Sequence, residues 1–290
     1  MRKRRLLIVG CGDIVRRALP QLARRWRLYA LVRRFEPALR LAGITQLVGD
    51  LDRPASLRRL AGIAEAVLHS APPPGEGADD ARTRRLLAAL ARSRSLPRRL
   101  VYISTTGVYG DCRGEVVAET RPLAAATARA RRRVAAERRL RRAGCRGLRV
   151  AILRAPGIYA ADRLPLERLE RGDPLLKPEE DVFTNHIHAE DLARACVVAL
   201  ERGRPNRAYN VCDDSVLPMG EWFDKLAAAF GLPRAPRLPR AELKHRLSPP
   251  QLSFMAESRR LDNRRMKREL KLRLVYPTVD HGIAAALENR

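Results

Sequence analysis

Residues 6–17 read LLIVGCGDIVRR, and this stretch decides how the rest of the chain folds. An apolar run, two glycines and then a helical pattern predict a buried strand, a tight turn and a helix. Gly10 permits the sharp turn, and Gly12 lets backbone N–H groups approach a pyrophosphate at the positive end of the helix. The motif therefore indicates a dinucleotide site, with Asp13 and Ile14 as further contacts in the first helical turn.

One position departs from the dinucleotide motif G-x-G-x-x-G. Its third small residue, where the helix passes close to the strand, is Val15. A branched side chain there costs roughly 1–3 kcal/mol if the helix cannot shift outward. A buried strand, turn and helix without any ligand is therefore the alternative interpretation, and the glycine motif alone does not decide between the two.

The charge of the chain bears on its partners. The chain has 290 residues, enough for one large domain or two smaller ones, and its formal charge is +26, nearly all of it from arginine. The arginines are spread along the whole sequence, and no patch interleaves them with the aromatic side chains that stack on bases. We therefore expect nucleic acid to bind only non-specifically and in a salt-sensitive way.

Cysteine usage and hydropathy bear on the compartment. The five cysteines are far apart and include no C-x-x-C pair, which is typical of a reducing cytoplasm. Basic residues 1–5 and apolar residues 6–10 imitate a signal peptide, but the apolar run is too short and Asp13 follows it. No later stretch is long enough to cross a membrane. We expect a cytoplasmic protein without membrane contact.

Short apolar runs alternate with helical patterns in the first part of the chain. After residues 6–9, the sequence predicts strands at 28–32, 44–48, 64–69 and 99–103. Helices are expected after the glycine turn, after Pro54 and over residues 78–94. Such alternation favours a Rossmann-type, doubly wound α/β fold with a parallel sheet, whose ligands bind at the carboxyl edge of the strands.

Two arginines end the second predicted strand. A carboxylate here would bind the ribose 2′-hydroxyl of NAD, whereas arginine suits the 2′-phosphate of NADP. The chain has Arg33 and Arg34 at this point and no carboxylate before Glu36. The sequence therefore favours NADP as the cofactor, with NAD as the alternative.

Three further motifs follow in order along the chain. Residues 104–110 read STTGVYG after the fifth strand, residues 183–193 read FTNHIHAEDLA, and residues 207–211 read RAYNV. Together with the glycine turn, they resemble the extended short-chain dehydrogenase/reductase superfamily, in its NAD-dependent epimerase/dehydratase branch. The resemblance covers roughly residues 6–212.

This resemblance implies roles for single residues. Thr105 takes the position whose hydroxyl lies beside the substrate carbonyl and the nicotinamide. Asp50 and Leu51 match the turn that contacts adenine, and Ala71 falls where the chain passes the cofactor. A small polar or sugar-like carbonyl or alcohol is the implied substrate.

The chain departs from this family at the catalytic pair. Members carry Y-x-x-x-K just before an A-A-E turn, and counting back from residues 135–137 places Arg129 and Arg133 at the two positions. Arginine stays protonated and cannot relay a proton. The chain therefore resembles atypical members that lack the pair, and the arginines of helix 127–142 are either solvated or line an anion-binding cleft. Tyr109 and Tyr159 are the candidates for an acid, with simple packing as the alternative for both.

Three functions follow as alternatives. The first is an NAD(P)-dependent oxidoreductase or epimerase/dehydratase-like enzyme, the second a non-catalytic NAD(P)-binding sensor, and the third a nucleic-acid-associated protein driven by charge. The resemblance divides the chain into an NAD(P)-binding domain at 1–155, to which 181–213 return, and a smaller substrate region at 156–180 and 214–290. Pairing of helices 78–94 and 127–142 with those of a second copy would give a homodimer, which the sequence leaves open.

Three histidines and two late segments complete the expectations. We expect His69, near a strand end, to be a packing residue. His186 and His188 fit a half-exposed strand or a metal pair that lacks a third ligand, and we expect no metal. Residues 261–273 predict a basic surface helix, and residues 281–287 predict a final helix.

Overall fold

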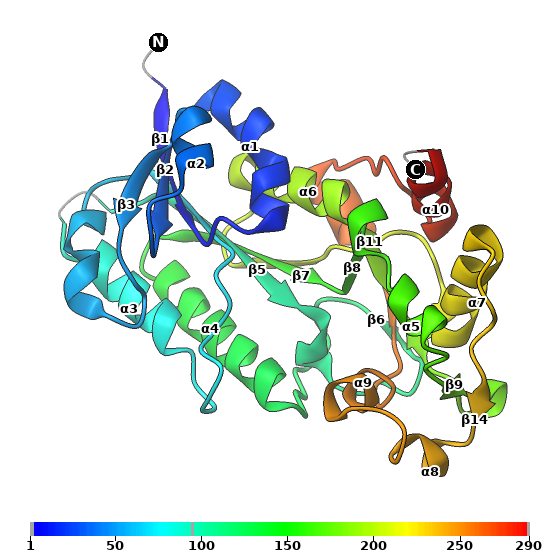
Figure 1. The fold of residues 1–290 in the computed structure, drawn as a ribbon. Helices are drawn as coiled ribbons and strands as arrows, with labels where there is room; N and C mark the ends of the chain where they lie inside the picture. Colours follow the sequence, from blue (N-terminus) through cyan, green and yellow to red (C-terminus); the bar gives the residue numbers. More distant parts are fainter. Residues whose placement is uncertain (1–2, 94–95, 289–290) are drawn as a thin grey trace.

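A seven-stranded parallel sheet lies at the centre of the computed structural model, which describes residues 3–93 and 96–288 (Figure 1). The strand order is β3-β2-β1-β4-β5-β7-β12, and every neighbouring pair is parallel. The predicted doubly wound α/β fold is therefore confirmed. The strands are β1 (Arg4–Val9), β2 (Trp26–Val32), β3 (Thr45–Val48), β4 (Ala66–His69), β5 (Arg99–Thr105), β7 (Arg149–Ala155) and β12 (Arg207–Asn210).

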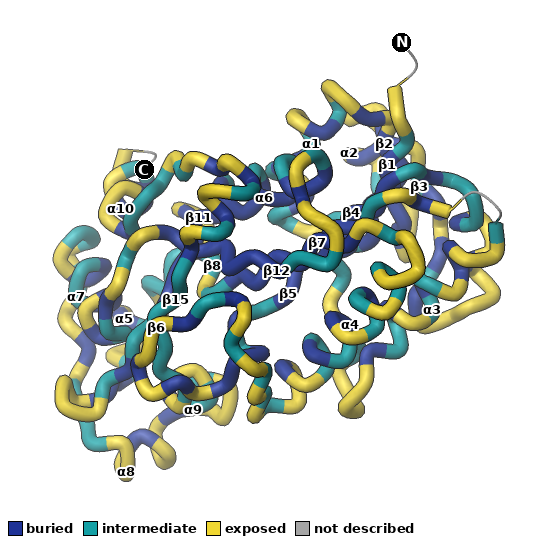
Figure 2. Tube along the Cα trace, turned by 180° about the vertical axis from the view of Figure 1, so that it is seen from behind, coloured by how far each residue is buried: buried dark blue, intermediate teal, exposed yellow. Residues whose placement is uncertain are grey.

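Helices cover both faces of this sheet (Figure 1). The helices α1 (Asp13–Arg25) and α6 (Ala189–Arg202) pack side by side on one face. On the other face lie the 3-10 helix η1 (Pro54–Leu60), α3 (Ala81–Leu90) and α4 (Ala128–Gly144). Side chains alternate along β1, so that alternate residues enter two separate apolar cores, one under each layer of helices. The buried stretches of Figure 2 accordingly follow the strands.

Two helices on the second face are tighter or shorter than the sequence predicts. The helix predicted after Pro54 is present, as the tighter 3-10 helix η1. Of the predicted range 78–94, α3 takes only Ala81–Leu90, and Arg94 lies outside the described residues. The helix begins after Asp80 because that carboxylate accepts a hydrogen bond from the backbone N–H of Thr83, at 3.0 Å.

Segments from the second half of the chain form a third apolar core beside the sheet, around Trp222 and Phe223. The predicted final helix is confirmed as part of α10. Among the described residues, no helix is both long and apolar enough to cross a membrane. The elements around this core and along the cleft beside it are β8 (Gly157–Tyr159), α5 (Leu166–Glu170), β9 (Leu175–Leu176), β10 (Phe183–Thr184), β11 (His186–His188), β13 (Leu217–Pro218), α7 (Met219–Phe230), β14 (Arg237–Leu238), α8 (Arg240–Leu243), α9 (Pro249–Phe254) and α10 (Val279–Glu288).

The predicted basic surface helix at 261–273 is wrong. Strand β15 (Arg260–Leu261) pairs with β6 (Val116–Val117), and a short π-helix, η5 (Met266–Leu270), follows it. Three apolar residues of the segment are buried in the core shared with α1 and α6: Met266, Leu270 and Leu272. The segment therefore packs against α6, where the side chain of Arg202 donates a hydrogen bond to the carbonyl of Leu270.

Candidate functional site

The carboxyl edge of the sheet carries a hollow of about 270 Å³ where the strand order turns from β1 to β4. Doubly wound sheets bind their ligands at such a switch point. The hollow brings together five of the residues that the sequence assigns to the cofactor: Gly10, Arg33, Asp50, Leu51 and Ala71. We call this hollow the dinucleotide pocket.

Gly10 closes the back of the dinucleotide pocket. Its φ is +89°, and a Cβ at this position would lie 2.5 Å from the backbone nitrogen of Ala71. Only glycine fits both the dihedral and the close approach of the two strand ends. The tight turn predicted from the sequence is therefore present.

Gly12 leaves room in front of helix α1. It is the N-cap residue, no side chain caps the helix there, and a Cβ at Gly12 would meet nothing within 4 Å. The first N–H groups of α1 thus face open space, which is the arrangement that binds a phosphate at a helix N-terminus. Val15 points the other way, because its side chain is 1% exposed and packs in the core beneath the helix.

Four residues that the sequence assigns to the cofactor do not line the dinucleotide pocket: Gly12, Asp13, Ile14 and Arg34. The Asp13 carboxylate pairs with Arg17 at 2.9 Å and with Arg163 at 2.9 Å. Ile14 is half-buried against the core, and Arg34 is exposed. Of the two arginines after β2, only Arg33 therefore faces the pocket.

The pocket also has lining residues that sequence reasoning did not assign. Glu36 lies on its wall and forms an ion pair with Arg16. Arg82, on α3, also lines the pocket. It pairs with Asp52, and its hydrogen bond lowers the pKa of that carboxyl group. The sequence could not predict that Arg82 lines the pocket, because this residue lies on a helix thirty residues after its partner Asp52.

A second and larger hollow, of about 550 Å³, opens at the same edge between the end of β5 and the third apolar core. We call it the cleft. Thr105 lines the cleft and is partly exposed, and its hydroxyl oxygen accepts a hydrogen bond from the N–H of Gly107 at 3.3 Å. Aromatic side chains form much of the wall: Tyr159, Phe183, Trp222, Phe223 and Phe254.

Tyr109 does not line the cleft but is buried behind it. Its hydroxyl donates to Asn210 Oδ1 at 2.6 Å and accepts from Arg154 Nη1 at 2.8 Å. Burial raises the pKa of Tyr109 to about 12. A hydroxyl that is enclosed and occupied on both sides has a structural role, so this geometry argues against Tyr109 as the acid.

Tyr159 lines the cleft with its ring rather than with its hydroxyl. The hydroxyl donates to the carbonyl of Thr278 at 3.2 Å, and burial is the main reason that its pKa is raised. A side chain at Gly282, on α10, would overlap the Tyr159 ring, so the helix presses directly on this wall. The tyrosine therefore packs, and its proton is directed away from the reacting space.

Arg129 and Arg133 both line the cleft, where the resemblance places the tyrosine and lysine of the catalytic pair. Arg133 Nη1 donates to the Ile103 carbonyl at 2.8 Å and to the Tyr102 hydroxyl at 2.9 Å. The guanidinium of Arg129 stacks over the ring of Phe254, with 4.7 Å between Cζ and the ring centroid. Arg133 is partly buried, whereas Arg129 is exposed to solvent.

The three histidines considered from the sequence are buried, and Nδ1 of His188 also accepts a hydrogen bond from the Glu190 N–H at 3.3 Å at the start of α6. His69 is fully buried, its Nε2 contacts Thr83 Oγ1 at 2.9 Å, and burial lowers its pKa to about 4. His186 and His188 are buried on β11 rather than half exposed, and burial lowers the pKa of His186 to about 3. Within the described ranges, no group of three His, Cys, Asp or Glu side chains is placed to hold a metal ion.

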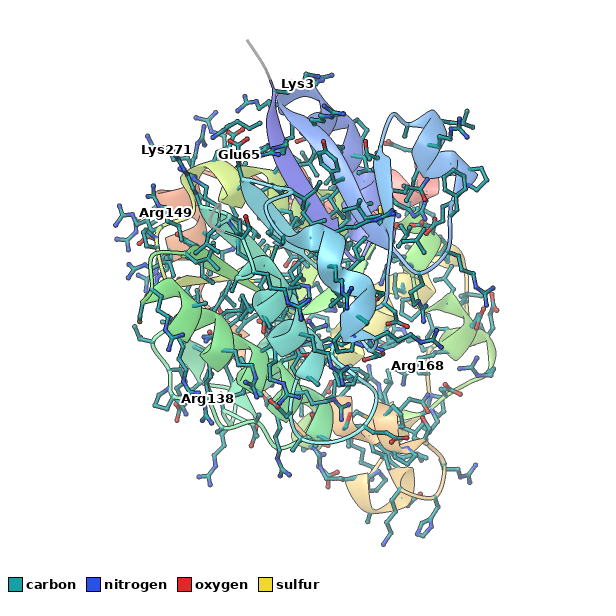
Figure 3. All side chains as sticks on the ribbon, turned by 90° about the vertical axis from the view of Figure 1, so that its left-hand side faces the viewer. Lys3, Glu65, Arg138, Arg149, Arg168 and Lys271 are labelled. Atoms are coloured by element: carbon teal, nitrogen blue, oxygen red, sulfur yellow. The ribbon has the colours of Figure 1, made fainter. Side chains whose placement is uncertain are left out.

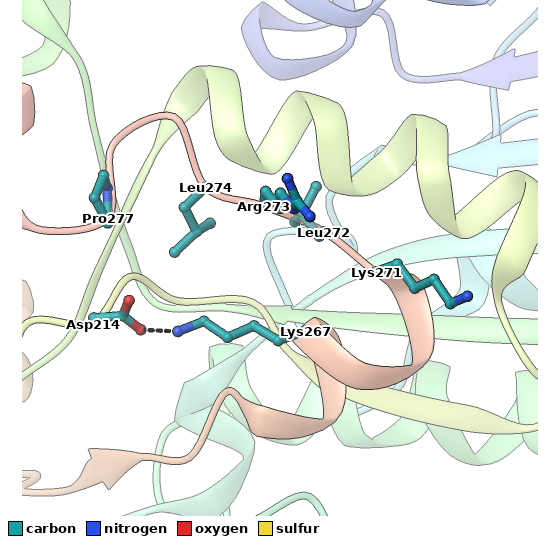
Figure 4. A pocket seen from close by; sticks show the side chains of 7 residues that line it. All are labelled: Asp214, Lys267, Lys271, Leu272, Arg273, Leu274 and Pro277. Atoms are coloured by element: carbon teal, nitrogen blue, oxygen red, sulfur yellow. Dashed lines mark hydrogen bonds and ion pairs between the residues drawn. The ribbon is translucent and has the colours of Figure 1, made fainter.

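A third hollow lies apart from the other two and shares no lining residue with them. It measures about 480 Å³ and lies between the loop after β12 and residues 271–277. Figure 4 shows Lys267 extended toward Asp214, with which it forms an ion pair. Lys267 is thus neutralised within the protein.

Comparison with known proteins agrees with this geometry. The model of a family described as the NAD dependent epimerase/dehydratase family matches residues 12–212. No curated protein matches the chain. A solved structure of a functionally unknown conserved protein from Silicibacter pomeroyi DSS is 30% identical, with 99% of both chains covered and a TM-score of 0.78.

Two solved structures with bound ligands share the fold. MoeE5 in complex with UDP-glucose and NAD is 21% identical, with a TM-score of 0.76 over 98% of this chain and 97% of that one. UDP-glucose 4-epimerase with UDP-glucose, from Thermotoga maritima, is 16% identical, with a TM-score of 0.79 over the same shares. At these identities the likeness concerns the fold alone.

Proposed function

Because the chain belongs to the NAD-dependent epimerase/dehydratase family, we propose that it binds a nicotinamide dinucleotide and uses it on a small polar or sugar-like substrate. The observation that supports this most is the pair of hollows at one edge of the sheet. The dinucleotide pocket ends at the open N-terminus of α1, and the cleft holds Thr105. One hollow suits the adenosine half of the cofactor, and the other suits the reacting half together with the substrate.

We propose NADP as the preferred cofactor, with NAD also accepted. Arg33 lines the pocket at the end of β2, where the 2′-position of the adenosine ribose falls in doubly wound folds. Glu36, the carboxylate nearest in sequence, is paired with Arg16 and thus is less available to a ribose hydroxyl. A guanidinium is well suited to a phosphate because it can donate two parallel hydrogen bonds.

For the chemistry, we propose that Thr105 holds the substrate oxygen at the nicotinamide. The cofactor supplies or accepts a hydride when bound. Neither tyrosine proposed as an acid presents its hydroxyl to the cleft, and the two arginines at the positions of the catalytic pair stay protonated. General acid–base assistance is typically worth about 10² to 10⁴-fold in rate, so turnover by this chain is expected to be slow.

The alternative function is a binding protein that senses the dinucleotide. The specific observation in its favour concerns Arg133, which stands at a position where an enzyme of this kind would need a residue that relays a proton. Its hydrogen bonds to Tyr102 and Ile103 hold the side chain on β5. In that case cofactor occupancy, rather than turnover, is the output.

Two measurements test these proposals. Thermal shift with about 1 mM NADPH or NADH tests binding, since a ligand at 100 times its Kd stabilises by about 2.7 kcal/mol. NADPH oxidation against a panel of ketones, oxo acids and nucleotide sugars then tests the enzyme function. Thr105→Ala should abolish any turnover, whereas Thr45→Ala, an exposed threonine on the edge strand β3, should leave it unchanged. No thermal shift with either cofactor contradicts both functions, and binding without turnover favours the sensor.

A further inference from the structure

Two cations in the cleft lack carboxylate partners. Arg129 and Arg133 stand one turn apart on α4, and across residues 3–93 and 96–288 neither forms an ion pair. Three other arginines of the cleft do have carboxylate partners: Arg163 pairs with Asp13, Arg259 with Glu257, and Arg168 with Asp173. Two of these carboxylates are shared, because Asp13 also pairs with Arg17 and Asp173 with Arg171. The two arginines of the cleft that have no carboxylate partner therefore both lie on α4.

The contacts of Arg133 hold it in place without neutralising it. Its two hydrogen-bond partners, the Ile103 carbonyl and the Tyr102 hydroxyl, carry no charge, and both are contacted through Nη1. The rest of the guanidinium keeps its donors for a ligand. A donor that is fixed before binding loses less conformational entropy when the ligand arrives.

Arg129 is also free to receive an anion. It stacks on the ring of Phe254, which orients the guanidinium plane but offers no hydrogen-bond acceptor. Arg133 is partly buried, so water screens its charge less than that of Arg129, which is exposed beside the 53% exposed ring of Phe254. The two side chains thus form a local excess of positive charge on the wall of the cleft that α4 supplies.

This charge lies next to the residue proposed to hold the substrate oxygen. Arg133 is bonded to Ile103, two residues before Thr105 on β5, and Thr105 lines the same cleft. An anionic group bound by the two arginines would therefore lie beside the reacting carbon. The cleft, at about 550 Å³, also has to admit the nicotinamide end of the cofactor, which leaves space for a small molecule.

We propose that Arg129 and Arg133 form a carboxylate-binding subsite, and that the substrate is a small oxo or hydroxy acid with its carboxylate next to the reacting carbon. The reaction that we assign to this substrate rests on the proposed function. Binding of the carboxylate by the two arginines can be tested without it. Arginine matches a carboxylate with two parallel hydrogen bonds, a geometry that a ketone or an alcohol cannot offer. The positions that carry a proton relay in the resembled family would here recognise an acid instead.

Binding can be read directly from Trp222. The chain has two tryptophans, and Trp222 lines the cleft whereas Trp26 packs under α1. In a Trp26→Phe background, fluorescence titration with acetate, 2-oxobutanoate, 2-oxoglutarate and inorganic phosphate reports occupancy of the cleft. Butanone serves as the neutral counterpart of 2-oxobutanoate. Each titration is run with and without NADPH.

The variants separate this subsite from the general charge of the protein. Arg129→Gln and Arg133→Gln should each weaken carboxylate binding roughly 10- to 100-fold, the usual range for a charge-assisted hydrogen bond. Arg138→Gln removes the same charge from the exposed side of α4, where Figure 3 labels it, and should bind as the parent does. Arg133→Gln loses its contacts to β5 and can destabilise the fold, so Arg129→Gln, which loses only a stacking contact, keeps the test decisive.

Each other result overturns the proposal. Absence of binding for every carboxylate, equal binding of butanone, or an equal loss in Arg138→Gln would each do so. Binding of phosphate alone, sensitive to Arg129→Gln, would overturn the carboxylate assignment in favour of a phosphorylated substrate. A loss of NADPH affinity without a loss of acid affinity in Arg133→Gln would place that arginine on the cofactor. Failure of NADPH to bind at all contradicts the proposed function, while the acid titrations without cofactor still report on the subsite.

Discussion

The guanidinium of Arg154 lies against the carboxylate of Glu137, with 2.7 Å between Nη2 and Oε2, and both side chains are buried. The pair connects β7 to α4 directly behind the cleft. Ser104 donates to the same carboxylate at 2.7 Å, which ties the end of β5 to it as well. Desolvated charges of this kind are stable only as long as both partners are present.

Removing one partner of this ion pair should cost far more stability than replacing both partners with apolar side chains. Arg154→Met leaves Glu137 buried with Ser104 as its remaining side-chain donor, and should lower the free energy of unfolding by about 3–5 kcal/mol. Arg154→Met combined with Glu137→Leu should recover much of that loss. Urea denaturation checks both. Equal destabilisation of the single and double variants would contradict the assignment of the cost to the unpaired charge.

Tyr109→Phe should affect stability rather than chemistry. Removing the hydroxyl leaves Asn210 Oδ1 without its donor and removes one acceptor from Arg154, at a cost of about 1–3 kcal/mol. NADPH affinity and any turnover should stay within twofold of the parent below the unfolding temperature. Loss of turnover at unchanged stability would show that Tyr109 takes part in catalysis after all.

Gly10→Ala should disturb the dinucleotide pocket. The new Cβ would meet the backbone of Ala71 at a φ that disfavours alanine, so we expect a loss of about 1–3 kcal/mol and of NAD(P)H binding. Gly12→Ala should leave stability nearly unchanged but weaken binding, because its Cβ would enter the space before α1. Gly75→Ala, in an exposed loop with open space, is the control for both. Thermal shift with and without NADPH gives the two quantities.

Arg33→Ser should change the cofactor preference. Loss of a charge-assisted contact to the 2′-phosphate should weaken NADPH binding roughly tenfold or more and leave NADH binding unchanged. Arg34→Ser removes the same charge next to it, from a side chain that does not line the pocket, and should change neither. Calorimetric Kd values for both cofactors decide the matter. An equal effect of the two substitutions would point to overall charge instead.

Asp213 should make stability depend on pH. It is buried, Oδ2 has no partner among the described side chains and backbone, and burial raises its pKa to about 8. The folded state therefore holds a proton that the unfolded state releases above about pH 4. The contribution of Asp213 to stability is greatest below that pH and falls as the pH rises toward 8, by up to about 1.4 kcal/mol per unit.

Asp213→Asn isolates this effect. The buried histidines act in the opposite direction, since their lowered pKa values remove stability only as the pH falls below about 6.5. Between about pH 6.5 and 8 the parent should lose stability in urea titrations, and Asp213→Asn should lose much less. Parallel curves for the two proteins would show that Asp213 is ionised in the folded state.

Local physics made the dinucleotide pocket predictable. A strand, a positive-φ glycine and a helix start follow one another within residues 6–13, so the turn can be recognised from neighbouring residues alone. The role of Tyr109 could not be found in this way, because its partner Asn210 is 101 residues away. Sequence proximity to the strand edge says nothing about which side of the sheet end a hydroxyl faces.

The segment 261–273 shows a second limit of sequence reasoning. Met266 and Leu270 have helical spacing, and the basic residues around them suggest a solvated helix face. The chain instead turns at Lys271, with a φ of 53°, and buries both apolar side chains against the core shared with α1 and α6. Its neighbours in that core come from distant parts of the chain, so tertiary packing overrides the local pattern.

The helix α10 supports one wall of the cleft, and this bears on the order in which the two hollows form while the chain is synthesised. Every residue that lines the dinucleotide pocket has been synthesised once the chain reaches Arg82. Tyr159, in contrast, packs against Gly282, which is added more than a hundred residues later. Chains fold from the N-terminal side as they leave the ribosome. The residues for the adenosine half of the cofactor are therefore synthesised long before the substrate wall, but they gain their full support only when α6 packs on α1 and β12 completes the sheet.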